Sequence, residues 1–146
     1  MNELFQNRVL LACLIAWLTA QLFKVLPGFL RTKKFDFKRF LYGLGGMPSS
    51  HSATVSALCV SCGMARGFDS VEFAITLILA LIVMSDASGI RRAAGKQAQK
   101  INQLMQEVFQ NDGTINGDKL LELLGHSPFE VLIGALLGVL VAIIVM

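Results

Sequence analysis

Apolar runs long enough to cross a lipid bilayer are the feature that most constrains this chain. A transmembrane helix needs about 20 mostly apolar residues to cross a hydrocarbon core of roughly 30 Å. Four segments approach that length, at about 8–26, 50–64, 71–85 and 129–146. Hydrophobic residues make up 54% of the 146 residues and charged residues only 16%, a composition too apolar for a soluble domain of this size. We therefore expect a single all-α domain over 1–146, an integral membrane bundle of about four transmembrane helices.

The second and third spans differ from the other two. The second carries Ser52, Thr54, Ser56 and Ser61, and the third is short, so both are expected to line the interior of the bundle instead of facing lipid. A largely helical cytoplasmic segment is predicted over 88–125, because apolar residues recur there at steps of three and four. We expect this segment to lie along the membrane surface.

The basic residues predict the orientation of the bundle. Ten of the 13 Lys and Arg residues fall in the first and third connections, namely Arg31, Lys33, Lys34, Lys38, Arg39, Arg91, Arg92, Lys96, Lys100 and Lys119. Short loops rich in Lys and Arg stay on the cytoplasmic side, so four crossings predict a bundle with both termini outside. The modest net charge of +3 is explained by topology and anionic lipid headgroups, and no nucleic-acid partner is expected.

Three polar clusters lie where the apolar segments end. They are Gly46–Ala53, Asp86–Lys96 and Gly125–Glu130. With four spans, all three clusters fall on the cytoplasmic side. The topology therefore predicts one shared active site at that face of the membrane.

The first cluster combines a helix N-terminus with a histidine. Pro48, Ser49 and Ser50 precede His51 at the start of the second span, where free backbone N–H groups and the helix dipole favour an anion. Ser49 or Ser50 is expected to cap the helix or to donate hydrogen bonds to a phosphate. A bound phosphate would favour the protonated form of His51 and make it a proton donor.

The other two clusters supply a second histidine and the cations. His126 and Glu130 are four residues apart, so on a helix the carboxylate can hold one ring nitrogen and leave the other as a nucleophile or base. Arg91, Arg92 and Lys96 are candidate phosphate-binding cations, although charges at the cytoplasmic end of a span are the simpler interpretation of the triplet.

Asp86 has three candidate roles: an ion-pair partner of Arg91 or Arg92, a polar helix end, or a magnesium ligand. We favour the ion pair, because a metal enzyme would need more convergent carboxylates than Asp86 and Glu130 provide. No metal and no cofactor is predicted. Gly134 and Gly138 on the last span permit close helix packing, which suits either a homodimer or packing within one subunit.

The three clusters together resemble the divergent branch of the type 2 phosphatidic acid phosphatase superfamily, which is related to vanadium-dependent haloperoxidases. The residues that carry the resemblance are Gly46–Ala53, Asp86–Ala98 and Gly125–Val131, and the likeness spans nearly the whole chain. It implies metal-independent hydrolysis of a lipid phosphate. His51 matches the histidine that protonates the leaving oxygen, His126 the nucleophile, and Glu130 the carboxylate that orients it.

The cations depart from the pattern of the main family. Ser50 stands where that family has Gly, Leu120 stands where it has a further Arg, and the loop before the first cluster has no Arg-Pro pair. If the resemblance holds, the cations that bind the phosphate must come from Arg91, Arg92 and Lys96 or from a neighbouring subunit.

The predicted function is a membrane-embedded lipid phosphate phosphatase that works through a phosphohistidine. Phosphatidylglycerophosphate, phosphatidate and isoprenyl diphosphate are all candidate substrates. The alternative is a non-catalytic binder or transporter of a lipid phosphate that keeps the oxyanion pocket, which would explain the missing cations.

Overall fold

The computed structural model describes residues 6–37, 40, 46–109, 120 and 125–146, with the backbone alone at 107–109. These residues form an all-α structure of five helices: α2 (Arg8–Thr32), α4 (Ser50–Arg66), α5 (Val71–Ser88), α6 (Ile90–Phe109) and α7 (Pro128–Val145). Gly89 alone separates α5 from α6. The predictions for Lys38, Arg39 and Lys119 fall outside the described residues.

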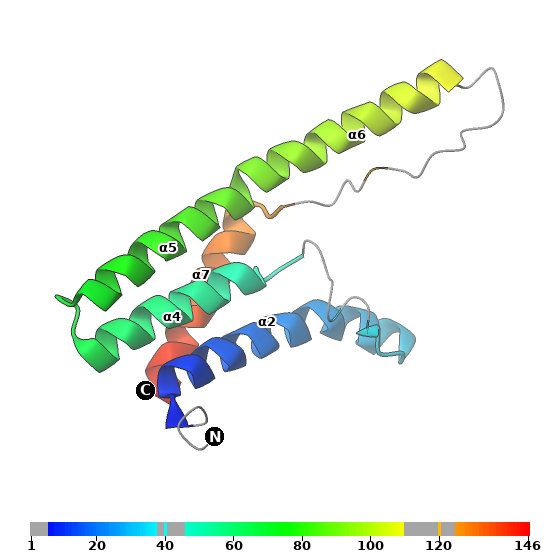
Figure 1. Ribbon diagram of the computed structural model, residues 1–146. Coiled ribbons are helices and arrows are strands. Elements are labelled where there is room, and N and C mark those ends of the chain that lie inside the picture. Colours follow the sequence, from blue (N-terminus) through cyan, green and yellow to red (C-terminus); the bar gives the residue numbers. More distant parts are fainter. Residues whose placement is uncertain (1–5, 38–39, 41–45, 110–119, 121–124) are drawn as a thin grey trace.

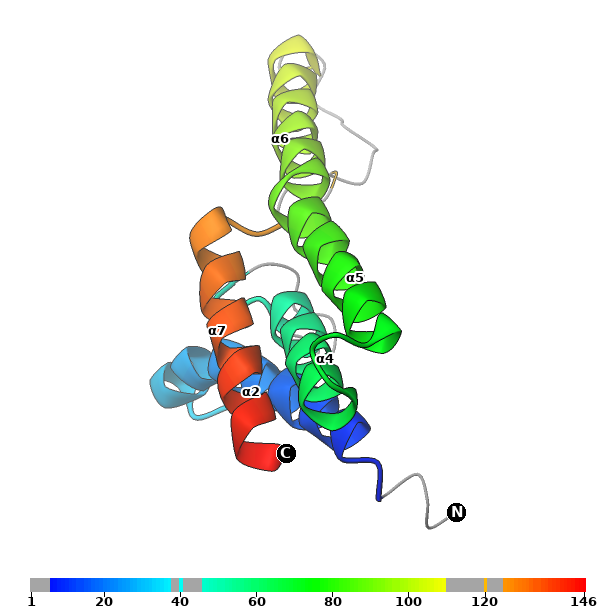
Figure 2. The same cartoon turned by 90° about the vertical axis from the view of Figure 1, so that its left-hand side faces the viewer.

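Four helices form a bundle in which the chain reverses direction at each step. The helices α2, α4 and α5 lie side by side and alternate in direction, and α7 runs back across them (Figure 1; Figure 2). The central helix is α4, which contacts α2, α5 and α7. Arg8 Nη1 donates to the carbonyl of Met146 at 3.1 Å, so the start of α2 and the end of α7 lie at the same end of the bundle.

Three helices in the described part of the chain are long and apolar enough to cross a membrane: α2, α5 with its continuation into α6, and α7. The prediction of four transmembrane helices is supported for these three. The exception is α4, which has 17 residues and a row of serines that lowers its hydropathy. Its serines at 50, 52, 56 and 61 are buried, as expected for a helix that lines the interior. The same expectation is wrong for α5, in which only Ala80 and Ala87 are buried, because α5 packs on the outside of α4.

Small side chains let these helices approach closely. The core is formed by Ala16 and Ala20 of α2, Ala53 and Ala57 of α4, and Val141 of α7. In a bilayer, helices associate through close packing of this kind, because lipid chains are as apolar as the side chains that they cover. The bundle therefore depends on shape complementarity between its helices.

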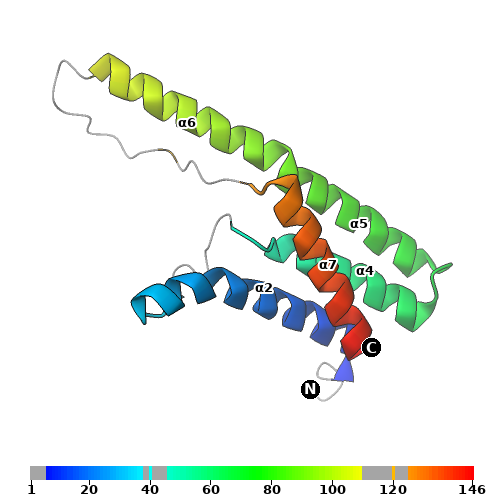
Figure 3. The same ribbon diagram turned by 180° about the vertical axis from the view of Figure 1, so that it is seen from behind.

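The helix α6 does not turn onto the side of the bundle. It continues the direction of α5 and projects beyond the other helices (Figure 3), so the expectation that it lies along the membrane surface is not met. The reason is local: the helix is interrupted only at Gly89, whose N–H still donates to the carbonyl of Ser85 at 2.8 Å. Leu120 lies beside α6, where its backbone exchanges two hydrogen bonds with the Asn102 side chain, at 2.9 and 3.1 Å.

Candidate functional site

Backbone contacts join the three polar clusters at one end of the bundle. The N–H of Ser49 donates to the carbonyl of Glu130 at 3.2 Å, and the N–H of His126 donates to the carbonyl of Ala87 at 2.9 Å. Gly125, at a φ of +90°, packs its α-carbon against the backbone of Arg92 so closely that a Cβ would collide with it. The start of α4, the junction of α5 with α6 and the start of α7 are therefore held together.

A buried lysine that the sequence analysis did not select completes this end of the bundle. Lys24 of α2 is only 5% exposed, and its Nζ donates to Ser50 Oγ at 3.1 Å. Lys24 also interacts electrostatically with Glu130. A charged residue inside an apolar membrane helix marks a functional site by default, so the position of Lys24 within 8–26 was a sufficient signal to find it.

His126 is held by the residue four positions after it. Its Nδ1 lies 3.3 Å from Glu130 Oε2, and the His126 side chain is buried. Glu130 also accepts from the N–H of Ser127 at 2.9 Å, as part of a capping box that starts α7 beside Pro128. An ionised carboxylate accepts a hydrogen bond from Nδ1–H, which keeps the proton on Nδ1 and leaves the lone pair of the imidazole on Nε2.

Two effects favour the neutral form of His126. Burial lowers the pKa of His126 below the ordinary histidine value, and the positive charge of Lys24 lowers it further, while the hydrogen bond and the negative charge of Glu130 act in the opposite direction. The net shift is downward. A neutral imidazole with its Nε2 lone pair available is the form that acts as a nucleophile.

His51 lies one residue into α4 and is exposed. The charges of Arg91, Lys24 and Asp86 act on it, and it also interacts electrostatically with His126. Both histidines therefore lie within electrostatic range of Lys24 and Arg91 and of each other. Arg91 itself is anchored, because its Nε lies 2.6 Å from Asp86 Oδ2, which is the ion pair favoured from the sequence.

The remaining predicted residues divide into two groups. Ser49 is the N-cap of α4 and accepts from the N–H and the hydroxyl of Ser52, while Ser50 accepts from Lys24. Arg92 and Lys96 are exposed on α6, and neither has an ion pair or a side-chain hydrogen bond within the described residues. Consecutive helical residues point about 100° apart, so Arg92 and Lys96 share a face of α6 that differs from the one that carries Arg91, whose charge acts on both histidines.

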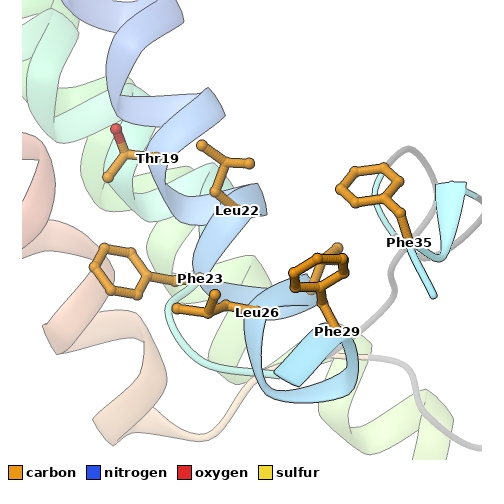
Figure 4. A pocket seen from close by; sticks show the side chains of 7 residues that line it. Thr19, Leu22, Phe23, Leu26, Phe29 and Phe35 are labelled. Atoms are coloured by element: carbon orange, nitrogen blue, oxygen red, sulfur yellow. The ribbon is translucent and has the colours of Figure 1, made fainter. Parts of the chain in front are cut away.

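Two apolar hollows lie near this end of the bundle, the first on α2 and the second at the junction of α5 with α6. A groove of about 430 Å³ is lined by Leu22, Phe23, Leu26 and Phe29 of α2 together with Thr19, Val25 and Phe35 (Figure 4). Leu22 and Leu26 are each two residues from Lys24 and so lie on the opposite face of α2. The second hollow, of about 520 Å³, is lined by Leu81, Ile82, Ser85, Asp86 and Ile90 and reaches the ion pair of Asp86 with Arg91.

Carboxylates and histidines do not gather into a metal site in the part of the chain that the structure describes. No group of three or more His, Cys, Asp or Glu side chains lies there in an arrangement that could hold a metal ion. The charged groups that act electrostatically on the histidines are Lys24, Arg91, Asp86 and Glu130.

The glycine pair of α7 packs within the chain. A Cβ on Gly134 would collide with the carbonyl of Ser49, and one on Gly138 with the carbonyl of Ala53. Of the two interpretations of this motif, the structure supports packing within one subunit, with the glycines placing α7 against the start of α4. The homodimer stays a prediction, and this motif no longer argues for it.

These features define a helical membrane protein whose buried polar residues gather at one end of the bundle. The chain belongs to the Divergent PAP2 family, whose model matches residues 5–141. It is 41% identical over 152 residues to the uncharacterised membrane protein YuiD of Bacillus subtilis strain 168, across 97% of this chain and 96% of that protein. No solved structure matches the chain.

Proposed function

We propose that the protein is a membrane-embedded phosphatase of lipid phosphates that works through a phosphohistidine at His126. The observation that carries the proposal is the contact of the buried imidazole of His126 with Glu130, within electrostatic range of the buried ammonium of Lys24. A nucleophile oriented by a carboxylate, beside a cation that can hold a phosphate oxygen, is the arrangement that phosphoryl transfer needs.

The first step is attack of His126 Nε2 on phosphorus, in line with the bond to the leaving oxygen. As the nitrogen–phosphorus bond forms, the bond from phosphorus to the lipid oxygen breaks and His51 transfers its proton to that oxygen. Water then attacks phosphorus, the nitrogen–phosphorus bond breaks, and neutral His51 accepts the proton of the water. The products are inorganic phosphate and a lipid alcohol, and both histidines return to their starting states.

Charge stabilisation comes from Lys24 and Arg91 in this proposal. Lys24 has two further N–H donors beyond the one directed at Ser50, and Arg91 keeps its Nη groups while Asp86 accepts from Nε. These donors would bind the equatorial oxygens of the phosphate. Arg92 and Lys96 are exposed on another face of α6, where they suit the approach of an anionic substrate more than contact with its reacting phosphate.

A lipid is the substrate class that the surroundings favour. The site lies at the end of a membrane bundle, and the apolar hollow beside Asp86 and Arg91 gives a hydrocarbon chain a way to approach the charged groups. Phosphatidylglycerophosphate, phosphatidate and isoprenyl diphosphate all satisfy this description. We further propose that this end of the bundle is cytoplasmic, because the described basic residues Arg31, Lys33, Lys34, Arg91, Arg92, Lys96 and Lys100 all lie toward it.

One observation favours the alternative of a non-catalytic binder: Arg91 is already paired with Asp86, which reduces the positive charge available to a transition state. Phosphate release from several lipid phosphates by the purified protein in detergent separates the two functions. We expect turnover that is lost in His126→Ala and in His51→Ala. Saturable binding of the lipid phosphates without any histidine-dependent release of phosphate would instead establish a binder.

A further inference from the structure

One buried amide oxygen of the membrane bundle has no hydrogen-bond partner among the described residues. Gln21 of α2 is only 4% exposed, and its Oε1 is buried without a donor among the described residues. Burying an amide oxygen away from water without a hydrogen bond costs free energy, and such groups are rare in folded proteins. The Gln21 oxygen is therefore an acceptor that is free to bind a donor from a water or from a ligand.

The position of Gln21 relates it to the phosphatase site. Gln21 and Lys24 are three residues apart, so they share one face of α2, and both are buried against the other helices of the bundle. A helix rises about 1.5 Å per residue, which places the Gln21 backbone about 4.5 Å from that of Lys24 along the axis. Gln21 lies on the side toward the interior of the bundle, away from the end where the histidines lie.

The other unpartnered atom provides a contrast. The hydroxyl oxygen of Ser61 is also buried without a partner, but Ser61 lies on α4 eleven residues beyond Ser50, about 16 Å along the helix. The Ser61 hydroxyl can rotate about one bond and can either donate or accept, whereas the Gln21 oxygen can only accept. Only Gln21 combines an unsatisfied acceptor with proximity to Lys24.

We propose that Gln21 accepts a hydrogen bond from a substrate hydroxyl on the carbon next to the phosphorylated carbon. The inference rests on the proposed function, which places the substrate phosphate at Lys24. A hydroxyl in that position lies a few ångströms from phosphorus. This distance is similar to the rise of about 4.5 Å along α2 between Lys24 and Gln21. The substrate is then a lipid phosphate with a neighbouring free hydroxyl, as in a glycerophosphate headgroup.

This assignment distinguishes among the candidate substrates by their chemistry. An isoprenyl diphosphate carries only hydrocarbon beyond its phosphates, and a phosphatidate carries an ester oxygen, which cannot donate, on the neighbouring carbon. Neither supplies a donor to Gln21 Oε1. A site with a buried acceptor rejects ligands that leave that acceptor unpaired, so Gln21 is a specificity-determining residue of the same site.

Binding of two phosphonates that cannot be hydrolysed tests the assignment without requiring turnover. The pair has identical short acyl chains and differs only in a hydroxyl or a hydrogen on the relevant carbon. We expect the full-length protein in detergent to bind the hydroxyl compound roughly three- to tenfold more tightly, as one neutral hydrogen bond provides. Gln21→Met should abolish this preference, and Ser61→Ala should preserve it.

Equal affinity of the wild-type protein for both phosphonates, or no binding of either, would overturn the assignment, as would a preference that survives in Gln21→Met. The result is separate from the fate of the proposed function, because a hydroxyl preference can be measured in a protein that releases no phosphate.

Thermal unfolding of the ligand-free protein provides a second readout. Because Gln21→Met removes an unsatisfied buried acceptor and keeps the length of the side chain, we expect the variant to have a Tm equal to or above that of the wild type. A lower Tm, or a variant that fails to fold, would mean that the amide has a structural partner inside the chain, and the assignment would be wrong.

Discussion

Lys24 Nζ lies 3.1 Å from Ser50 Oγ in a buried contact between α2 and the first turn of α4. This contact connects the first apolar helix to the histidine cluster, because His51 follows Ser50 directly. It also places at the site a cation that does not belong to the Asp86–Lys96 cluster. The proposed phosphatase chemistry uses this ammonium as its most deeply buried charge.

Replacement of Lys24 by Met should weaken the binding of orthovanadate, a phosphate analogue. A hydrogen bond to a charged group contributes about 1.5–3 kcal/mol, so we expect the inhibition constant of vanadate to rise roughly 10- to 150-fold. Lys34→Met is the matched control, since Lys34 is exposed just beyond α2. If the two variants bind vanadate equally well, Lys24 does not contact the oxyanion.

The pH dependence of kcat/KM should report the titration of His126. The nucleophile must be neutral, and the pKa of His126 is lowered by its burial and by Lys24, so activity should persist below the ordinary histidine pKa of about 6.5. Removing the positive charge in Lys24→Met should move the acid limb to higher pH. Removing the negative charge in Glu130→Gln should move it to lower pH.

Glu130→Gln also tests orientation, because glutamine keeps an oxygen for the cap of α7 while losing the charge that holds Nδ1. We expect kcat to fall about 10- to 100-fold, as for the loss of other well-placed catalytic groups, with little change in Tm. Acid limbs that coincide in the wild type and both variants would show that His126 is not the titrating group.

Much of this arrangement is predictable from the sequence, for identifiable reasons. The apolar runs fix α2, α5 and α7, because length and hydropathy decide whether a helix can span a membrane. The His126–Glu130 contact was predicted for two positions on a helix, but His126 precedes Ser127, the N-cap of α7, so the capping box at the start of α7 produces the contact. The Asp86–Arg91 ion pair follows from a short separation across a helix junction. Each of these contacts is local in the chain.

Contacts between distant segments could not be derived in the same way. Lys24 meets Ser50 only because α2 packs against α4, and no local spacing encodes that packing. Which of Arg91, Arg92 and Lys96 lies closest to the site depends on how α6 is rotated about its own axis after Gly89. The continuation of α6 along α5 has the same origin, because a single glycine interrupts the helix without redirecting it.

Close packing of α7 on α4 predicts that an alanine at Gly134 destabilises the protein and that one at Gly28 does not. A Cβ at Gly134 would collide with the backbone of Ser49, whereas a Cβ at Gly28 of α2 meets nothing within 4 Å. We expect Gly134→Ala to destabilise the protein by about 1–3 kcal/mol, as overpacking does, and Gly28→Ala to be neutral or stabilising by up to about 1 kcal/mol. Thermal unfolding in detergent measures both, and equal effects would contradict the packing.

The path of α4 predicts which positions share a side of the membrane. The site end of the bundle includes Lys34, and the opposite end includes Ser70 and Met146. With Cys13, Cys59 and Cys62 replaced by Ala, single cysteines at Ser70 and Met146 should react with an impermeant thiol reagent from outside intact cells, and one at Lys34 should react only after lysis. Labelling of positions 34 and 70 from the same side would mean that α4 does not cross.

The most direct test of the account is the trapping of a phosphorylated histidine. The His51→Ala variant is mixed with a phosphate ester that has a good leaving group, and the reaction is stopped rapidly without acid. We expect mass spectrometry to find a phosphoryl group bound to His126. That variant should accumulate the intermediate, because such a leaving group needs no proton donor while the attack of water still needs a base. Phosphate release by the wild-type protein with no label on His126, or with the label on another residue, would contradict the proposed mechanism.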